Sequence, residues 1–325
     1  FCVSFYFDLT IGPLRKTYAV VVLSVKHSNL KGKNMVSRRH TLPIIAICMA
    51  LSLALLAGCG AKTGSSGSKK ASTNAESGTV TIEVSDTMVN LAQAWAESYM
   101  KTNPQAVITV KGGGSGAGIA SLINGGITFA DASREAKDDE KQAVQDAGKT
   151  FTETPVARDG IAVIVNGSNS VKNLSTDQLG KIYRGEITDW KDVGGKAGKI
   201  VLLGRDTSSG TYEFFSEAVV GKDKRYAKTM RSMQSSQAIV DEVKNNPNAI
   251  GYVGMGYEDP ETVVLNIDGK AATSDAVKDG SYTLSRDLYM DSLGAPTGIA
   301  KTYLDWVLSP EGQNVVEQQG FVKLK

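Results

Sequence analysis

Short apolar runs alternate with amphipathic segments along most of the chain. The first run, Thr79–Val84, alternates polar and apolar residues and predicts a strand. Apolar residues at helical spacing then fall on one face between Met88 and Tyr99, so we expect a helix there. Either Asp86 or Thr87 could cap this helix at its beginning.

The same order of strand, turn and helix recurs down the chain. Further strands are expected at Val107–Val110, Ile127–Ala130, Ile161–Val165, Ile200–Leu203, Ile250–Val253 and Val263–Ile267. Further helices are expected up to Asn124, over Ser175–Tyr183, Thr211–Val220 and Ser236–Asn245, and from Ser309-Pro310-Glu311 onward. This alternation predicts an α/β fold with largely parallel sheets. Because ligands bind beyond the carboxyl ends of strands in such sheets, the loops that follow strands are the candidate sites.

The beginning of the chain carries a targeting signal. An apolar run, Leu42–Leu56, follows two arginines and is short for a membrane-spanning helix, so it predicts a secretory signal peptide. It ends in Leu56-Ala57-Gly58-Cys59, which resembles the lipobox of bacterial lipoproteins, where cleavage precedes a cysteine that is then lipidated. We therefore expect a signal peptide over residues 35–58 and a lipid anchor on Cys59 at the extracytoplasmic face of the cell membrane. An ordinary signal with a chance cysteine is the alternative.

Two flanking segments lie outside the folded body. Residues 1–34 precede Met35, which stands where a signal peptide should begin, so we expect them to be translated upstream sequence; a real N-terminal extension is the alternative. Residues 59–78 lack large apolar side chains and predict a flexible tether.

The composition narrows the possible chemistry. The 325 residues allow about two domains. Seven of the 36 basic residues and one of the 34 acidic residues precede Cys59, so the rest of the chain has a net charge of −4 and nothing favours nonspecific nucleic-acid binding. Both histidines and the other two cysteines also precede Cys59. Disulfides, a cysteine nucleophile, a Ser-His-Asp triad and a His/Cys zinc site are therefore excluded from the body, and carboxylate chemistry or binding without catalysis remains.

Four loops after predicted strands carry groups that bind oxyanions. They are Ser85-Asp86-Thr87, the glycine-rich loop Gly112–Gly118 with Ser115 inside it, Ser133-Arg134, and Arg205-Asp206-Thr207-Ser208-Ser209-Gly210-Thr211. Three of the four lie at the start of a predicted helix, where unpaired N–H groups and partial positive charge favour an anion. The two arginines add planar, permanently charged donors.

Each loop alone has a less specific interpretation. Ser85-Asp86-Thr87 suits a helix cap, and Ser133-Arg134 suits an exposed surface. The glycine-rich loop also passes the loose Gly-x-Gly-x-x-Ala pattern of dinucleotide sites, but an exported lipoprotein meets little NAD. The loop from Arg205 to Thr211 is the most specific of the four.

Taken together, these loops resemble those of the phosphate-binding proteins of bacterial phosphate ABC transporters, and the resemblance runs from Thr79 to Leu324. It is also carried by Ile182-Tyr183-Arg184-Gly185, Thr188-Asp189-Trp190, Ala249-Ile250-Gly251-Tyr252, Leu284-Ser285-Arg286 and Leu308-Ser309-Pro310-Glu311-Gly312. The resemblance implies a two-lobed periplasmic-binding-protein-like fold that closes on phosphate about a hinge. Lobe I would comprise residues 79–158 and 257–325, and lobe II residues 159–256.

The resemblance also implies the site and the partners. Phosphate would contact Ser85, Asp86, Thr87, Ser115, Ser133 and Arg134 from lobe I, and Arg205, Ser209, Gly210 and Thr211 from lobe II. The protein would be a monomer without cofactor, metal or catalysis that delivers phosphate to the permease and ATPase subunits of a transporter. It departs from many members in having Val84 before the first loop in place of glycine, and Thr207 in place of an acid.

The missing acid leaves open which carboxylate recognises the ligand. Phosphate keeps a proton at neutral pH and sulfate does not, so a carboxylate in the site accepts a hydrogen bond from phosphate and repels sulfate. We expect Asp86 to do this, with Asp206 as the alternative, because Asp206 stands beside Arg205. A binding protein for another oxyanion such as sulfate or molybdate, a phosphate sensor and an exported phosphatase are the other candidate functions.

Overall fold

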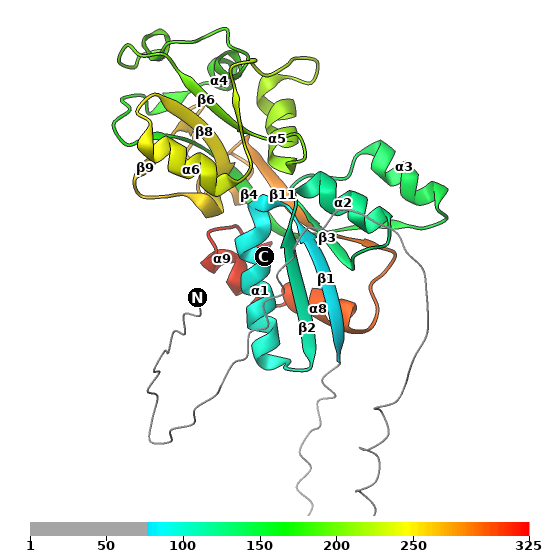
Figure 1. Ribbon diagram of the computed structural model, residues 1–325. Helices are drawn as coiled ribbons and strands as arrows, with labels where there is room; N and C mark the ends of the chain where they lie inside the picture. Colours follow the sequence, from blue (N-terminus) through cyan, green and yellow to red (C-terminus); the bar gives the residue numbers. More distant parts are fainter. Residues whose placement is uncertain (1–76, 325) are drawn as a thin grey trace, which may run out of the picture. The chain divides into compact units, whose positions relative to one another are not determined.

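The computed structural model describes residues 77–324 (Figure 1). The expected signal peptide, the expected lipidation site Cys59, residues 1–34 and nearly all of the expected tether lie outside the described residues. No helix within residues 77–324 has both the length and the apolar character needed to cross a membrane.

The first lobe is built on parallel strands. Strand β1 pairs with β2 on one side and with β3 on the other. The expected apolar face of the first helix is buried against this sheet through Leu91, Trp95 and Tyr99. The elements are β1 (Gly78–Val84), η1 (Asp86–Met88), α1 (Val89–Thr102), β2 (Ala106–Gly112), α2 (Ser115–Ile123), β3 (Phe129–Ala132), α3 (Asp138–Asp146), β11 (Ser285–Leu293), α8 (Gly298–Val307) and α9 (Pro310–Gln318).

The second lobe has its own core around strands β6 and β8, which run parallel. Tyr183, Phe215 and Tyr252 pack in its centre, with the rings of Phe215 and Tyr252 stacked 3.9 Å apart. The elements are β5 (Asn173–Leu174), α4 (Thr176–Tyr183), η2 (Trp190–Val193), β6 (Val201–Arg205), α5 (Gly210–Phe215), η3 (Ser216–Val220), β7 (Arg231–Met233), α6 (Ser236–Asn245), β8 (Ala249–Gly254), η4 (Met255–Tyr257), β9 (Thr262–Val264), β10 (Asn266–Ile267) and α7 (Ser274–Lys278).

One long strand, β4 (Phe151–Asn166), joins the two lobes. Its first part pairs with β11 and its second part with β8, so the sheet runs in the order β2-β1-β3-β11-β4-β8-β6-β7. The chain passes between the two cores after Gly160 and again before Ser285, and these two residues are register partners. Figure 1 shows β4 and β11 side by side at this crossing. Two adjacent crossings of this kind form a natural hinge.

The α/β class predicted from the pattern is confirmed, but the sheet is less parallel than expected. The central pairs β3–β11, β11–β4 and β4–β8 are antiparallel. The packing also differs from the expected division into lobes, which assigned residues 257–325 to lobe I. Apolar residues between Leu265 and Leu284 pack in the core around β6 and β8, since β9 joins the sheet beside β4 and α7 contacts β4.

Two local predictions were wrong. Neither Asp86 nor Thr87 caps α1; both lie in the short 3-10 turn η1 that precedes it, and no side chain caps either element. The segment expected as one strand at Val263–Ile267 is split, because β9 pairs with β4 while β10 pairs with β5. The last helix does begin as predicted, with the Ser309 hydroxyl accepting from the Gly312 N–H and Pro310 in its first turn.

Candidate anion-binding site

Three serine hydroxyls from the first lobe meet at the ends of its parallel strands. The Oγ atoms of Ser85 and Ser133 lie 2.7 Å apart, and those of Ser115 and Ser133 lie 3.3 Å apart. The Ser133 N–H donates to Ser115 Oγ at 3.0 Å. All three residues are buried. The structure therefore brings together the first three loops that the sequence singled out.

The fourth loop meets this cluster from the second lobe. Ser209 caps α5 by accepting from the Tyr212 N–H, which directs the first turn of that helix at the serines. A methyl group on Gly210 would lie 2.7 Å from Ser133 Oγ, so only glycine allows this approach. The next residue, Thr211, places its Oγ1 2.5 Å from that of Thr87. We call Ser85, Thr87, Ser115, Ser133 and Thr211 the hydroxyl cluster.

A buried arginine on β11 completes the cluster. Arg286 Nη2 donates to Thr211 Oγ1 at 2.9 Å, and its Nη1 donates to the Ser133 carbonyl at 2.7 Å. The same guanidinium forms an ion pair with Asp159 Oδ2 at 2.9 Å. Asp159 also accepts from the Met255 N–H at 3.0 Å. One cation, Arg286, therefore contacts the hydroxyl cluster, and one carboxylate, Asp159, pairs with that cation; both are deeply buried.

Burial governs the electrostatics of this pair. It raises the pKa of Asp159, while the charge and hydrogen bonds of Arg286 act in the opposite direction. Burial lowers the pKa of Arg286, and Asp159 partly offsets that shift. The Arg286–Asp159 ion pair has no net charge. A site built from this pair and the surrounding hydroxyls can bind an oxyanion through directed hydrogen bonds instead of through excess positive charge.

Sequence reasoning did not identify Arg286 or Asp159 as site residues. Arg286 lies in the Leu284-Ser285-Arg286 motif, which supported the family resemblance without being given a role. Its position depends on the antiparallel register of β11 and β4, which pairs Arg286 with Asp159 across 127 residues. No local pattern reports that register, so the available signal was the arginine of the Leu284-Ser285-Arg286 motif.

The predicted ligand residue Arg205 has other partners. Its Nη1 forms an ion pair with Asp86 Oδ2 at 2.9 Å and contacts Ser236 Oγ at 3.2 Å. Its Nε and Nη2 donate to the backbone carbonyls of Met233 and Gln234. Four of its five N–H groups are thus engaged, and Asp86 is bound to it.

Arg134 is likewise occupied by carboxylates. Both of its terminal nitrogens donate to Glu140, at 2.7 and 2.8 Å, and its Nε is paired with Glu213. Lys137 Nζ also contacts Glu213, at 2.5 Å. Glu140 and Glu213 come from α3 and α5, so the Arg134 side chain is held from both lobes.

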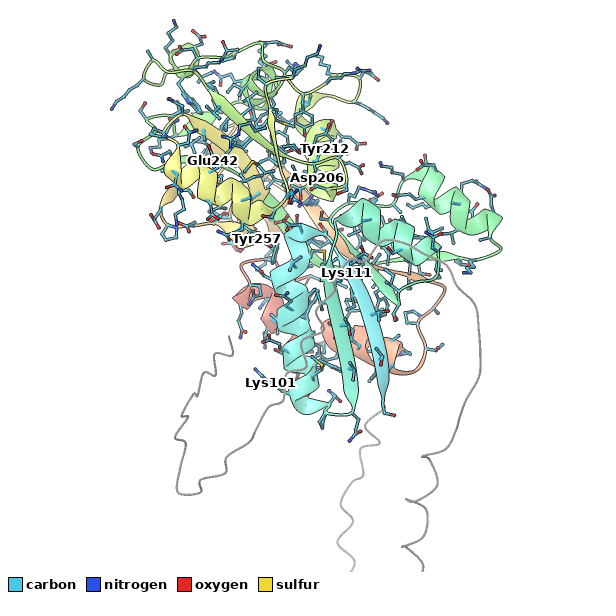
Figure 2. All side chains as sticks on the ribbon, in the orientation of Figure 1. Lys101, Lys111, Asp206, Tyr212, Glu242 and Tyr257 are labelled. Carbon is cyan, nitrogen blue, oxygen red and sulfur yellow. The ribbon has the colours of Figure 1, made fainter. Side chains whose placement is uncertain are left out.

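The alternative acid, Asp206, faces its own loop. Its Oδ1 accepts from the Ser208 N–H at 2.9 Å and from the Ser208 hydroxyl, and its Oδ2 lies 3.9 Å from Arg205 Nη2. It is about one-third exposed, at 35% for the side chain. Figure 2 shows Asp206 and Tyr212 close to the junction of the lobes, whereas Lys101 lies at the far end of lobe I.

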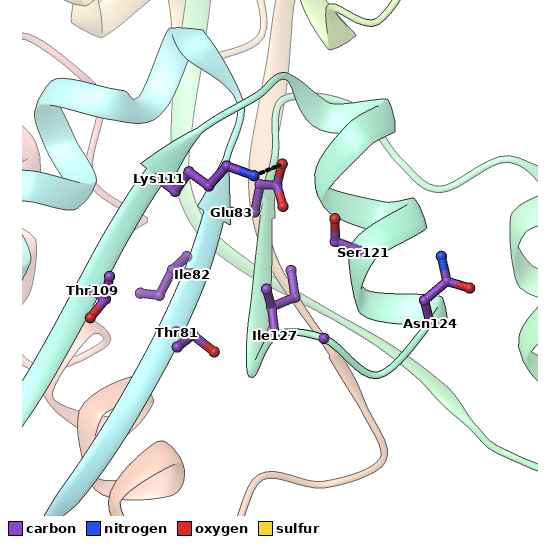
Figure 3. A pocket seen from close by; sticks show the side chains of 9 residues that line it. Thr81, Ile82, Glu83, Thr109, Lys111, Ser121, Asn124 and Ile127 are labelled. Carbon is purple, nitrogen blue, oxygen red and sulfur yellow. Dashed lines mark hydrogen bonds and ion pairs between the residues drawn. The ribbon is translucent and has the colours of Figure 1, made fainter. Parts of the chain in front are cut away.

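A separate surface pocket of about 440 Å³ lies on lobe I between β1, β2 and the end of α2 (Figure 3). Its main charged contact is the ion pair of Lys111 with Glu83, at 3.2 Å. None of the predicted site residues lines it. Within residues 77–324, no three His, Cys, Asp or Glu side chains gather in a way that could hold a metal ion.

Comparison with known proteins identifies the family that has this architecture. A family profile described as a PBP superfamily domain matches residues 69–311. The phosphate-binding protein PstS of Bacillus subtilis is 34% identical over 86% of this chain and 93% of its own length. PstS of Staphylococcus haemolyticus is 34% identical over 82% and 88%, respectively.

Solved structures agree in fold. A phosphate ABC transporter substrate-binding protein of Clostridium perfringens, solved with bound phosphate, has a TM-score of 0.72 and 33% identity, covering 76% of this chain and 100% of its own. An ABC-type phosphate transport receptor of Vibrio cholerae has a TM-score of 0.63 and 28% identity, with coverage of 76% and 100%. These proteins are named for binding and transport, not for catalysis. The chain therefore belongs to the PBP superfamily, within the family of the PstS phosphate-binding proteins.

Proposed function

We propose that this protein captures inorganic phosphate between its two lobes and delivers it to the permease of a phosphate ABC transporter. The observation that carries the proposal is the buried hydroxyl cluster, which both lobes supply and which Arg286 contacts. The names of its relatives and of a neighbour with bound phosphate support the choice of ligand.

The hydroxyl cluster and the first turn of α5 would bind the phosphate oxygens. The hydroxyls would exchange their mutual hydrogen bonds for bonds to the ligand, and the first residue of α5, Gly210, lies against Ser115 and Ser133 of the same cluster. Ser209 contributes by capping that helix. Arg286 supplies the positive charge, and closing the lobes excludes water, which strengthens each contact.

Selectivity for phosphate would come from Asp159. This carboxylate lies beside the hydroxyl cluster, because it shares the Arg286 guanidinium with Thr211. A carboxylate here accepts a hydrogen bond from a protonated oxyanion and repels a fully ionised one. Asp86, which the sequence favoured for this role, and Asp206, its alternative, are bound to groups outside the cluster.

The sequence supports a lipid-anchored monomer at the extracytoplasmic face of the membrane. Cys59 ends the signal segment, and residues 59–78 would tether the folded body to the lipid. Such a tether lets the body reach a membrane permease while it remains at the surface. The partner subunits would be the permease and ATPase of the transporter.

Isothermal titration of the purified protein with phosphate, sulfate and molybdate tests the ligand. We expect tight binding of phosphate and no comparable binding of the other two. Tighter binding of sulfate or molybdate would assign the protein to another oxyanion. Turnover of a phosphomonoester would instead point to an exported phosphatase.

A further inference from the structure

Each arginine predicted to bind the ligand contacts a carboxylate from the opposite lobe. Arg205 of lobe II binds Asp86 of lobe I, and Arg134 of lobe I binds Glu213 of lobe II. We propose that these two pairs are interlobe latches that hold the site closed around its ligand. The inference rests on the proposed function and identifies what controls the release of phosphate.

The first latch places a carboxylate where a helix binds an anion. Asp86 Oδ2 accepts from the Ser236 N–H at 2.7 Å and from the Ser236 hydroxyl at 2.9 Å, in addition to Arg205. Ser236 is the first residue of α6, a ten-residue helix whose N-terminus carries partial positive charge. Tyr257 Oη also donates to the Asp86 carbonyl, at 2.8 Å. The carboxylate thus makes three charge-assisted contacts to the other lobe.

In the second latch the charges are exchanged: lobe II supplies the carboxylate and lobe I supplies the cations. Glu213 reaches from α5 to Arg134 and Lys137, which both follow β3 in the first lobe. The backbone approaches closely beside it, since the Gly116 N–H donates to the Ser208 carbonyl at 3.1 Å. Gly114, with φ of +92°, permits this approach, because a side chain there would lie 2.9 Å from the same carbonyl.

Geometry makes both latches depend on closure. Within the described residues the chain crosses between the two cores at the paired residues Gly160 and Ser285, so rotation about this hinge would separate Asp86 from Ser236 and Glu213 from Arg134. The carboxylates would then be hydrated, and the contacts would form again on closing. Contacts that only the closed form makes slow the release of a ligand held between the lobes, because the ligand leaves through the open form.

The test uses the full chain and radiolabelled phosphate. Asp86→Asn and Glu213→Gln each remove one latch charge, and the double variant removes both. Asp192→Asn and Glu217→Gln are the controls: Asp192 is exposed on lobe II, and Glu217 is exposed one turn beyond Glu213. We expect each latch variant to release phosphate about tenfold faster or more, with an association rate that does not fall. The effects should multiply in the double variant, and the controls should match the parent protein.

Two further measurements test the first latch if Asp86→Asn folds poorly or if no phosphate is bound. Ser236→Ala removes one donor to Asp86 and leaves every charge in place, so it should speed release even if Asp86→Asn folds poorly. In protein without phosphate, hydrogen exchange at the Ser236 N–H should be faster in Asp86→Asn than in Asp192→Asn.

Release at the parent rate in Asp86→Asn, Glu213→Gln and the double variant would overturn the latch proposal. Variants that bind more weakly only because phosphate associates more slowly would overturn it as well. If the parent protein binds no phosphate, the proposed function fails instead. The exchange measurement then decides the latch, and equal exchange in the two variants would overturn it.

Discussion

Arg286 and Asp159 form an ion pair of 2.9 Å in which the two side chains are 3% and 0% exposed. The neighbouring register pair, Arg158 with Asp287, has the same chemistry but is 39% and 37% exposed. Adjacent rungs of the same antiparallel ladder thus carry one buried pair at the candidate site and one pair in solvent. This contrast supplies a matched control for the first prediction.

Arg286→Gln should abolish measurable phosphate binding and destabilise the fold. Among residues 77–324 the change removes the one charged donor to the hydroxyl cluster, and it leaves Asp159 buried without its partner, which costs about 3–5 kcal/mol in comparable cases. Arg158→Gln should cost at most about 1 kcal/mol and leave binding intact, because exposed pairs contribute little. Calorimetric titration and urea unfolding of both variants provide the comparison. Parent-like affinity in Arg286→Gln would remove this arginine from the site.

Gly210→Ala should weaken phosphate binding while the fold persists. The added methyl group would meet Ser133 Oγ at 2.7 Å, so the start of α5 could no longer approach the hydroxyl cluster, and overpacking of this kind costs about 1–3 kcal/mol. Gly126→Ala is the control, since its nearest neighbour would be 3.6 Å away. Circular dichroism should show both variants folded. Equal affinity in the two would mean that α5 does not close on the ligand.

Gly210 and Arg286 differ in how far the sequence alone predicts their place in the site. The approach of Gly210 could be expected, because a small polar loop between a strand and a helix is a local signal. Arg286 could not, because its place depends on how β11 pairs with β4. The partners of Arg134 and Arg205 were equally hidden, since Glu213 and Asp86 lie on opposite lobes and meet their arginines only in the folded chain.

Asp131 should make the protein less stable as the pH rises. It lies fully buried on β3 with no hydrogen-bond partner for either carboxyl oxygen within residues 77–324, and burial raises its pKa well above the ordinary value of about 3.9. The folded state therefore holds the proton more tightly than the unfolded chain. Its stabilising contribution is complete below the unfolded pKa and is lost as the pH rises through the folded pKa.

Asp131→Asn removes that titration and keeps the shape of the side chain. The free energy of unfolding, measured in urea between pH 4 and pH 8, should fall less steeply with rising pH in this variant than in the parent. The exposed substitution Asp192→Asn should keep the parent slope. Identical slopes in Asp131→Asn and the parent would show that the carboxyl group does not titrate in this range.

Cys59→Ser should release the protein from membranes. The cysteine ends the expected signal segment, and several acyl chains on one residue anchor a protein firmly, whereas one chain alone is marginal. Membrane and soluble fractions of cells that express the parent and the variant give the measurement after a salt wash. A variant that stays in the membrane fraction would identify Leu42–Leu56 as an uncleaved anchor.

Asp159→Asn should lower the ratio of phosphate to sulfate affinity. Asparagine keeps the size of the side chain and can still accept one hydrogen bond, but it no longer repels a fully ionised anion. It also leaves the charge of Arg286 unbalanced, which favours sulfate. Sites that recognise a ligand hydrogen discriminate by as much as about 10⁴–10⁵, so a fall of at least about a hundredfold is expected.

The rival carboxylates supply the controls for this last change. Asp86 Oδ2 accepts from three donors of lobe II, and Asp206 accepts from Ser208, but none of these donors contacts the hydroxyl cluster as Arg286 does. Asp86→Asn should weaken phosphate and sulfate binding to the same degree, because a latch acts on closure whatever the anion. Asp206→Asn should leave the ratio unchanged. Titration of all three variants with both anions separates the roles: a ratio that collapses in Asp86→Asn and persists in Asp159→Asn would return selectivity to the residue that the sequence favoured.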